Sequence, residues 1–140
     1  MRVTEPRVVD AIHYTGADTS GEIVNWAITP ENENTQLVII TVTLINQQAS
    51  QAVVVIDEEA AQLVTAEGQT LKPLNTVARS KSIEAIGASY LDPRFLPLWN
   101  TVSIGSGEQI VGQMVFEVPS GSKFKDFRWQ ATDNMSARFN

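Results

Sequence analysis

The stretch GEQIVGQMVFEVPSGSKFKDFRWQ, residues 107–130, decides the fold class because its hydrophobic residues recur with a period of two. From Ile110 to Val118 every second residue falls on the same side of an extended chain. The run ends at Pro119, which cannot donate to a sheet ladder. Alternation then resumes, with Phe127 and Trp129 on one side and charged or polar residues on the other. We therefore predict two antiparallel strands that pair with each other and leave one face in solvent.

A second stretch, LVIITVTLIN at residues 37–46, also alternates but is largely apolar and β-branched on both faces. This pattern is typical of a strand in the centre of a sheet. The run AVVVID that follows, residues 52–57, is too short for a helix, and we predict that it pairs antiparallel with residues 37–46. The predicted core between two sheets consists of Val38, Ile40, Val42, Leu44, Met114, Phe116, Phe127 and Trp129.

The rest of the chain consists of short extended runs separated by turns. Glu67-Gly68 marks a tight hairpin, and RVVDAIHY (residues 7–14) and SARFN (residues 136–140) are predicted as the first and last strands. One helical turn is expected near Ser82–Ile86, at the start of a long proline-containing connection. The predicted fold class is all-β, an immunoglobulin-like antiparallel β-sandwich of about seven or eight strands forming a single domain over residues 1–140.

Composition narrows the classes of function. The 140 residues carry a formal net charge of −6 without a basic cluster, which disfavours a nucleic-acid partner. No apolar run approaches the length of a transmembrane helix, and the opening MRVTEPRVVD lacks the apolar core of a secretory signal. Cysteine is absent, which removes disulfides and thiolate chemistry.

The order of motifs resembles the DUF4352 group of bacterial extracytoplasmic domains, which have an immunoglobulin-like sandwich. The resemblance runs from about Val8 to Phe139, and its matching segments are LVIITVTLIN, QLVTAEGQTLKP and GSGEQIVGQMVFEVPSGS. Ser106 stands where the group commonly has proline, and the connection over residues 75–100 is longer than usual. The resemblance implies a secreted protein or lipoprotein at the cell surface, with a signal or lipobox removed upstream of Arg2. From the lack of catalytic side chains and from the strand pattern, we predict a non-enzymatic interaction or accessory role, with another protein or a cell-envelope component as the partner.

The sequence contains few side chains of the types that catalysis or metal binding requires. His13 is the only histidine and falls in a presumed edge strand, so we predict no histidine-dependent catalysis. The acidic groups Glu31 with Glu33, and Asp57 to Glu59, lack the alternating pattern of a calcium loop. We predict no enzyme, no cofactor and no metal site, although a hydrolase with a carboxylate pair remains a third hypothesis.

The candidate binding residues are Trp26, Arg94, Phe95 and Trp99. The tryptophans are expected in connections near prolines, and LDPRFLPLWN (residues 91–100) combines arginine with aromatic residues, the types that dominate interface hot spots. One alternative is a carbohydrate-binding module that uses Trp26 or Trp99 for stacking. Another is that Phe95, Leu96 and Trp99 only close one open end of the sandwich.

Overall fold

The computed structural model describes residues 1–47, 50–86, 91–92, 94–132 and 135–139. Strands make up 55% of the structure and helix is almost absent, so the expected all-β antiparallel sandwich is confirmed. The structure divides it into more pieces than the seven or eight strands expected, several of them only two or three residues long. The elements are β1 (Arg2–Val3), β2 (Arg7–Val9), β3 (Ile12–Ala17), β4 (Ile23–Ile28), β5 (Thr35–Ile45), β6 (Gln51–Ile56), β7 (Ala61–Thr65), β8 (Thr70–Leu71), α1 (Thr76–Arg79), β9 (Lys81–Ile83), β10 (Asn100–Gly105), β11 (Gln109–Pro119), β12 (Phe124–Trp129) and β13 (Met135–Arg138). No helix in the described ranges is long and apolar enough to span a bilayer.

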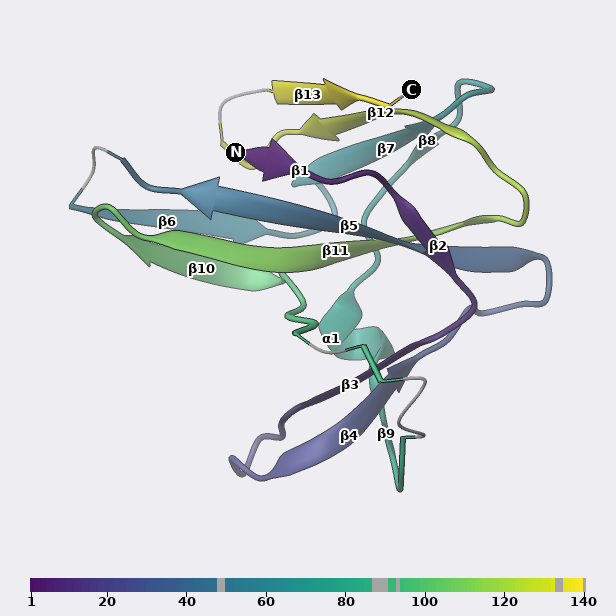
Figure 1. The fold of residues 1–140 in the computed structure, drawn as a ribbon, viewed down its shortest axis with the longest axis horizontal. Coiled ribbons are helices and arrows are strands. Elements are labelled where there is room, and N and C mark those ends of the chain that lie inside the picture. The colour runs from purple at the N-terminus through teal and green to yellow at the C-terminus, as the bar shows by residue number, and fades with distance from the viewer. Residues whose placement is uncertain (48–49, 87–90, 93, 133–134, 140) are drawn as a thin grey trace.

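The long strands β5 and β11 form the central layer of the molecule (Figure 1). They pair antiparallel along the full length of both, with Val38 opposite Phe116 and Ile40 opposite Met114. The other edge of β5 is covered by β1 and β2, so the predicted central position of residues 37–46 is confirmed. Its β-branched residues fit this position because they pack well on both faces of a pleated surface.

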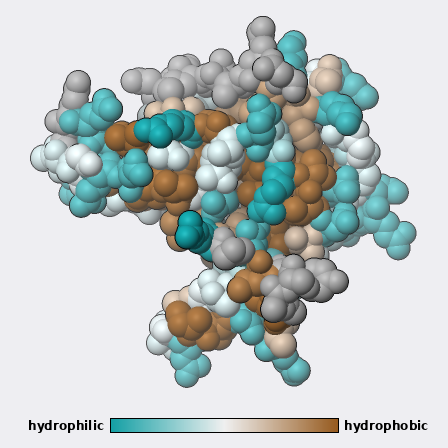
Figure 2. Space-filling view, viewed as in Figure 1, coloured by the Kyte–Doolittle hydropathy of each residue, from teal (hydrophilic) through white to brown (hydrophobic). Residues whose placement is uncertain are grey.

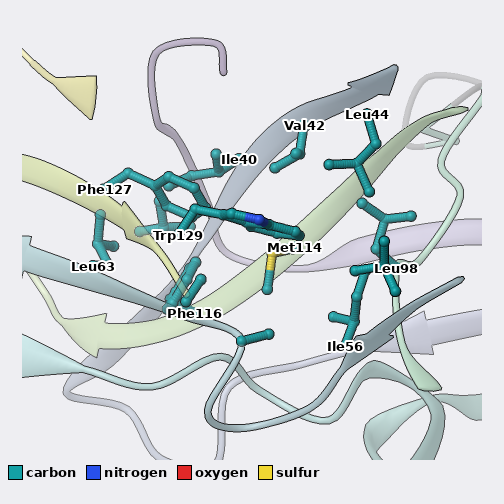
Figure 3. Close-up of a cluster of buried hydrophobic side chains, with 14 of the residues drawn as sticks. Ile40, Val42, Leu44, Ile56, Leu63, Leu98, Met114, Phe116, Phe127 and Trp129 are labelled. Atoms are coloured by element: carbon teal, nitrogen blue, oxygen red, sulfur yellow. The ribbon is translucent and has the colours of Figure 1, made fainter. Parts of the chain in front are cut away.

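The second layer of the sandwich contains the β10–β6 pair and the sheet β13–β12–β7–β8. The main core lies between this layer and one face of β5 and β11 (Figure 3). All eight residues predicted for the core are buried in it. Trp129 is also hydrogen-bonded, with its Nε1 donating to Thr132 Oγ1 at 2.7 Å. The tight hairpin at Glu67-Gly68 is confirmed as the turn between β7 and β8, and the expected last strand is β13.

Two predicted strand pairings are wrong. β6 pairs with β10 instead of β5, and β11 pairs with β5 while β12 pairs with β7 and β13. In both cases the turn carries the chain across to the opposite layer instead of back along the same sheet. Buried Asn46 fixes the first crossing, since its Nδ2 donates to the carbonyl of Ile104 at 2.9 Å and its carbonyl accepts from the N–H of Gly107 at 2.7 Å.

The predicted solvent-facing side of the central layer is instead partly covered by a third, smaller sheet, β3–β4–β9. Leu37, Ile39 and Val115 point away from the main core and form a second cluster with residues from this sheet and its connections, namely Ile12, Tyr14, Ile28, Leu74 and Phe95. The small sheet projects from the sandwich as the lower lobe in Figure 1. The expected first strand is consequently split, because β2 pairs with β5 whereas β3 pairs with β4.

The predicted helical turn lies in the wrong place. The single helix described is α1, which precedes Ser82–Ile86, and Lys81–Ile83 instead pairs with β4 as β9. Asn75 caps the helix, its Oδ1 accepting from the N–H of Ala78 at 2.9 Å. The turn therefore forms where a capping side chain is available, and the residues after it are drawn into the small sheet.

The connection before β10 is held against β11 by Gly112. A Cβ at this position would lie 2.6 Å from Leu98 Cγ and 2.9 Å from the carbonyl oxygen of Leu96. Without that atom, the segment approaches closely enough for Leu98 N–H to bond the carbonyl of Gln113 at 2.9 Å, and for Gln113 N–H to bond that of Leu96 at 2.8 Å. Gly112 thus admits a bulky neighbour, and this neighbour is the segment that forms one wall of the groove.

Candidate functional site

A groove of about 440 Å³ lies between the outer half of the β3–β4 hairpin and the wall formed by α1 and the Phe95–Pro97 segment. It is on the lower lobe, where hydrophobic residues are visible at the surface (Figure 2). Most of its surface is apolar. The lining residues are Tyr14, Thr15, Gly16, Ala17, Asp18, Thr19, Trp26, Val77, Ser80, Phe95, Leu96 and Pro97.

Strand alternation explains how the hairpin supplies this lining. Tyr14 pairs with Trp26, and the next pair on the same face toward the hairpin tip joins Gly16 to Val24. The pair toward the sandwich, Ile12 with Ile28, is fully buried in the second core, whereas Trp26 is only partly buried. The apolar face thus extends past the edge of the sandwich that covers it, and the uncovered part becomes the groove.

Gly16 leaves an open position between two aromatic rings. A Cβ on this residue would lie 3.6 Å from Trp26 Nε1 and 3.7 Å from Tyr14 Cε2, which are ordinary contact distances. Tyr14 also packs on Phe95, with ring centroids 4.9 Å apart. The position above Gly16 is therefore bordered by aromatic groups and could hold an apolar group of a ligand.

The polar atoms of these aromatic residues are already paired within the chain. Trp26 Nε1 donates to the carbonyl of Gly16 at 3.1 Å. Ser80 Oγ donates its proton to the carbonyl of Thr76 at 2.6 Å, so in its contact with Tyr14 the tyrosine hydroxyl is the donor. Burial raises the pKa of the Tyr14 hydroxyl, and the hydrogen bond with Ser80 opposes that shift. These rings are held in place and present apolar surface to the groove.

Asp18 places a negative charge at the hairpin end of the groove. Its Oδ1 accepts from Ser20 Oγ at 2.6 Å, from Ser20 N–H at 2.8 Å and from Glu22 N–H at 3.0 Å. The hydrogen bond from the Ser20 hydroxyl, together with those from the backbone, lowers the pKa of the carboxyl, so it is ionised at neutral pH. No lysine or arginine of the described residues lies within 4.0 Å of it.

The structure brings together two of the four predicted binding residues. Trp26 and Phe95 both line the groove, but Trp26 lies in strand β4, so its expected place in a connection is wrong. Phe95 is only 7% exposed and belongs to the second core as well as to the groove wall. Leu96 beside it is 50% exposed. The segment therefore closes part of the lobe and still presents apolar surface.

Arg94 and Trp99 are outside the groove lining. Arg94 is exposed and has a left-handed backbone, with φ of 64°. Trp99 is partly buried against the main core at the start of β10. Trp99 lies in the connection before β10, as expected, and its neighbours are bonded to the sandwich, Leu98 to β11 and Asn100 to β6.

Tyr14, Gly16, Asp18 and Ser80 are not among the four candidate binding residues chosen from the sequence. A signal for the first two was present, because Ile12 and Tyr14 alternate in one run while Trp26 and Ile28 alternate in the next. Reading the two runs as one hairpin would have placed both aromatic residues on one face. No sequence pattern indicated that Ser80 would reach Tyr14, a contact between residues 66 positions apart.

The two acidic clusters considered as metal ligands, residues 31–33 and 57–59, contribute side chains to hydrogen bonds and ion pairs within the chain. Asp57 Oδ1 accepts from the N–H of Glu59, whose own carboxylate pairs with Lys72 at 2.7 Å. Glu31 lies 3.5 Å from Arg79. Among the residues placed by the structure, no three histidine or carboxylate side chains gather as a metal site would require. His13 lies in β3, where its carbonyl accepts from the N–H of Asp92 at 2.8 Å.

The fold and the groove define an all-β antiparallel domain with an aromatic-lined surface site. No protein-family model matches the chain, and no curated protein sequence matches it. The chain is similar to a solved structure of MPT63, a secreted protein from Mycobacterium tuberculosis, with 18% sequence identity, coverage of 87% of this chain and 86% of that chain, and a TM-score of 0.35. At this TM-score the similarity carries no argument, and the fold class rests on the strand pairing described above.

Proposed function

We propose that this protein is a non-enzymatic binding domain that holds a partner in the groove between the β3–β4 hairpin and the Phe95–Pro97 segment. The observation that carries the proposal is the position above Gly16, bordered by Trp26 and Tyr14, whose polar atoms are paired within the chain. Sites that bind small molecules or peptide side chains commonly combine such apolar lining with a few polar groups at the edge. Thr15, Asp18 and Thr19 are the polar groups here.

A binding role is favoured over chemistry by the residues in the groove. Its titratable side chains are those of Tyr14 and Asp18. The tyrosine hydroxyl is engaged with Ser80 and its pKa is raised, which makes it a poor base at neutral pH. The Asp18 carboxyl has a lowered pKa, the opposite of what a general acid needs. Neither group is prepared for proton transfer.

The partner that we propose is a protein or another component of the cell envelope, and the domain would act outside the cytoplasm, as a secreted protein or as part of a lipoprotein. This location is supported by the resemblance of the sequence motifs to those of extracytoplasmic domains. No protein-family model matches the chain. Fractionation of the source organism with an antibody to this protein tests it. Recovery in the envelope or culture medium is expected, and recovery in the cytoplasm alone would contradict the location.

The groove itself is tested with Gly16→Leu. A Cβ at this position makes only ordinary contacts, at 3.6–3.7 Å from side-chain atoms of Trp26 and Tyr14, and we expect the leucine side chain to fill the groove while the fold survives. Purified wild type should be retained by the envelope fraction of the source organism, and Gly16→Leu should not. Thr101→Leu, which places the same leucine side chain on the exposed face of β10, is the control and should be retained like wild type. Equal retention of all three would contradict the proposal.

A carbohydrate ligand is a second candidate, because Trp26 is partly exposed in the groove with the hydroxyl-bearing residues Thr15 and Thr19 nearby. Aromatic rings stack on the apolar faces of sugars. On a glycan array this candidate predicts binding that is lost in Trp26→Ala and kept in Trp99→Ala. Binding lost equally in both variants would place the sugar elsewhere.

A further inference from the structure

Strand β3 is the edge of the small sheet, which is ordered β3–β4–β9. At the hairpin tip, Asp18 N–H bonds the carbonyl of Glu22 at 2.8 Å, so the even-numbered residues of β3 direct their backbone groups toward β4. The odd-numbered residues must then direct theirs to the open edge. The bond from Asp92 N–H to the carbonyl of His13 lies on this open side and agrees with the assignment.

Among the described residues, the chain itself occupies only the beginning of this edge. Leu91 forms a parallel bridge with His13. If the parallel ladder continued, Thr15 N–H would bond the carbonyl of Asp92, and Arg94 N–H would bond the carbonyl of Thr15. Neither bond occurs. The left-handed backbone of Arg94, with φ of 64°, turns the segment away from β3 before it reaches Phe95.

The groove begins where that segment leaves the edge. Its lining includes every residue from Tyr14 to Thr19. Side chains of a strand alternate between faces, so a site that contacts consecutive residues runs along the strand's edge, not only over one face. Thr15 and Ala17 have no backbone partner on this side among the described residues. Edge strands are commonly protected by proline, a charged side chain or a bulge, and Thr15 to Ala17 carry none of these.

We propose that the open edge at Thr15–Ala17 accepts an extended segment of a partner protein as an additional strand. This inference rests on the proposed binding function and specifies how the partner is bound. Backbone groups of the segment bond those of Thr15 and Ala17. The flanking side chains of the segment, which face the same side as Tyr14 and Gly16, enter the groove, and an apolar one fills the position above Gly16. Main-chain bonds supply affinity and the groove supplies selectivity, as in other cases of strand addition.

Charge indicates that the segment is basic. Asp18 ends the edge with an ionised carboxylate, and Glu22 lies in the same turn, with no described lysine or arginine within 4.0 Å of either. A lysine or arginine beside the apolar residue would therefore find complementary charge at the hairpin end. A second copy of this chain fits less well, because each copy carries a formal net charge of −6 and brings the same acidic turn.

Random peptides displayed on phage test the proposal. Selection on wild-type protein, with depletion on Gly16→Leu, should enrich sequences with alternating apolar residues and a lysine or arginine. For the synthetic peptides that result, Gly16→Leu and Thr15→Pro should each weaken binding at least tenfold. Asp18→Asn keeps the oxygen that accepts the turn's hydrogen bonds and should weaken binding about two- to fivefold, less so in high salt. Thr101→Leu should bind like wild type.

Backbone methylation separates strand addition from side-chain binding alone. N-methylation at every second peptide residue, where the N–H groups face β3, should abolish binding, while methylation at the intervening residues should leave it within a few-fold. Equal sensitivity at all positions, no enrichment of peptides, or peptides that bind Gly16→Leu as well as wild type would overturn the proposal.

Two further outcomes have defined meanings. If wild type self-associates in analytical ultracentrifugation and Thr15→Pro does not, the occupant is a second copy and the partner-protein proposal is overturned. If peptides fail but envelope retention still depends on Gly16, the strand-addition inference fails while the proposed binding function stands. Circular dichroism of each variant confirms that the fold is retained, and Ala17→Pro provides a second edge variant if Thr15→Pro does not fold.

Discussion

Arg79 Nη2 lies 2.7 Å from Glu117 Oε1, and this ion pair fastens the short helix α1 to the central strand β11. The same nitrogen donates to the carbonyl of Thr29, just after β4, at 2.8 Å. Glu117 in turn accepts from Thr35 Oγ1 at 2.7 Å and from the N–H of Glu31 at 3.0 Å. One partly buried network thus connects the sandwich to the two sides of the lobe that form the groove.

Glu117→Gln should lower the free energy of unfolding by about 1–3 kcal/mol, because it removes the charge from a carboxylate that accepts hydrogen bonds from three directions. Urea denaturation measures the change. Glu31→Gln is the matched control, since Glu31 is 70% exposed and lies farther from Arg79, at 3.5 Å. The control should stay within about 0.5 kcal/mol of wild type. Similar losses in both variants would show that the network does not depend on Glu117.

The same carboxylate predicts a pH dependence. Burial acts to raise the pKa of Glu117, but the hydrogen bonds from Arg79, Thr35 and Glu31 outweigh it, and the pKa is held below the ordinary value of 4.5. The stabilisation is therefore present above pH 4.5 and is lost as the pH falls through the lower, folded-state pKa. The stability difference between wild type and Glu117→Gln should shrink over this acidic range, and a difference that stays constant down to the acid limit of folding would contradict the assignment.

Gly112→Ala should destabilise the protein by about 1–3 kcal/mol, because the added Cβ collides both with Leu98 and with the backbone carbonyl of Leu96. Gly16→Ala is the matched control, with contacts at 3.6 Å and beyond, and should change stability by less than about 0.5 kcal/mol. Thermal unfolding of the two variants provides the comparison. If Gly112→Ala unfolds with wild-type behaviour, the connection before β10 is not packed as described.

Phe116→Ala should cost about 3–5 kcal/mol, since the ring is fully buried and its loss leaves a cavity. Phe116 meets Phe127 edge-on across the two layers, with ring centroids 6.3 Å apart. The variant is expected to populate unfolded states at mild denaturant concentrations, as followed by the fluorescence of the three tryptophans, of which Trp129 lies in this core. An unchanged denaturation midpoint would mean that this ring lies outside the stabilising core.

Tyr14→Phe should cost about 0.5–1.5 kcal/mol through loss of the hydrogen bond to Ser80, and Ser80 keeps its bond to Thr76. Burial raises the pKa of Tyr14 above 10.0, so its contribution is complete below that pH and declines as the pH rises through the folded-state pKa. A Tyr90→Phe background leaves Tyr14 as the single tyrosine, and ultraviolet titration then reads its ionisation directly. Ionisation at or below the ordinary pKa would refute the buried, donating hydroxyl.

The sequence was sufficient for the fold class and for the main core. Period-two alternation in residues 37–46 and 110–118 depends only on which side chains must leave water, and that requirement is local to each strand. Together with the same alternation at Phe127 and Trp129, it placed all eight predicted core residues correctly. The pairing partner of each strand could not be predicted from alternation, because the sequences after β5 and β11 are compatible with either a hairpin or a crossing between layers. The crossing depends on tertiary contacts such as that of Asn46 with Ile104.

The candidate site, like the fold, was only partly predictable from the sequence. Sequence alone selected Trp26 and Phe95 as aromatic residues suited to binding, and it excluded thiol chemistry from the absence of cysteine. Only the tertiary structure decided that Trp26 and Phe95 line one groove with Tyr14, and that Arg94 and Trp99 lie outside it. It also decided that, among the described residues, none pairs with the outer edge of β3 at Thr15–Ala17. Alternation identifies a face that must be covered, but what covers it is set by residues far along the chain. Here Leu74 and Phe95 pack on the inner part of the β3–β4 face and leave the outer part uncovered, so the groove results from tertiary packing.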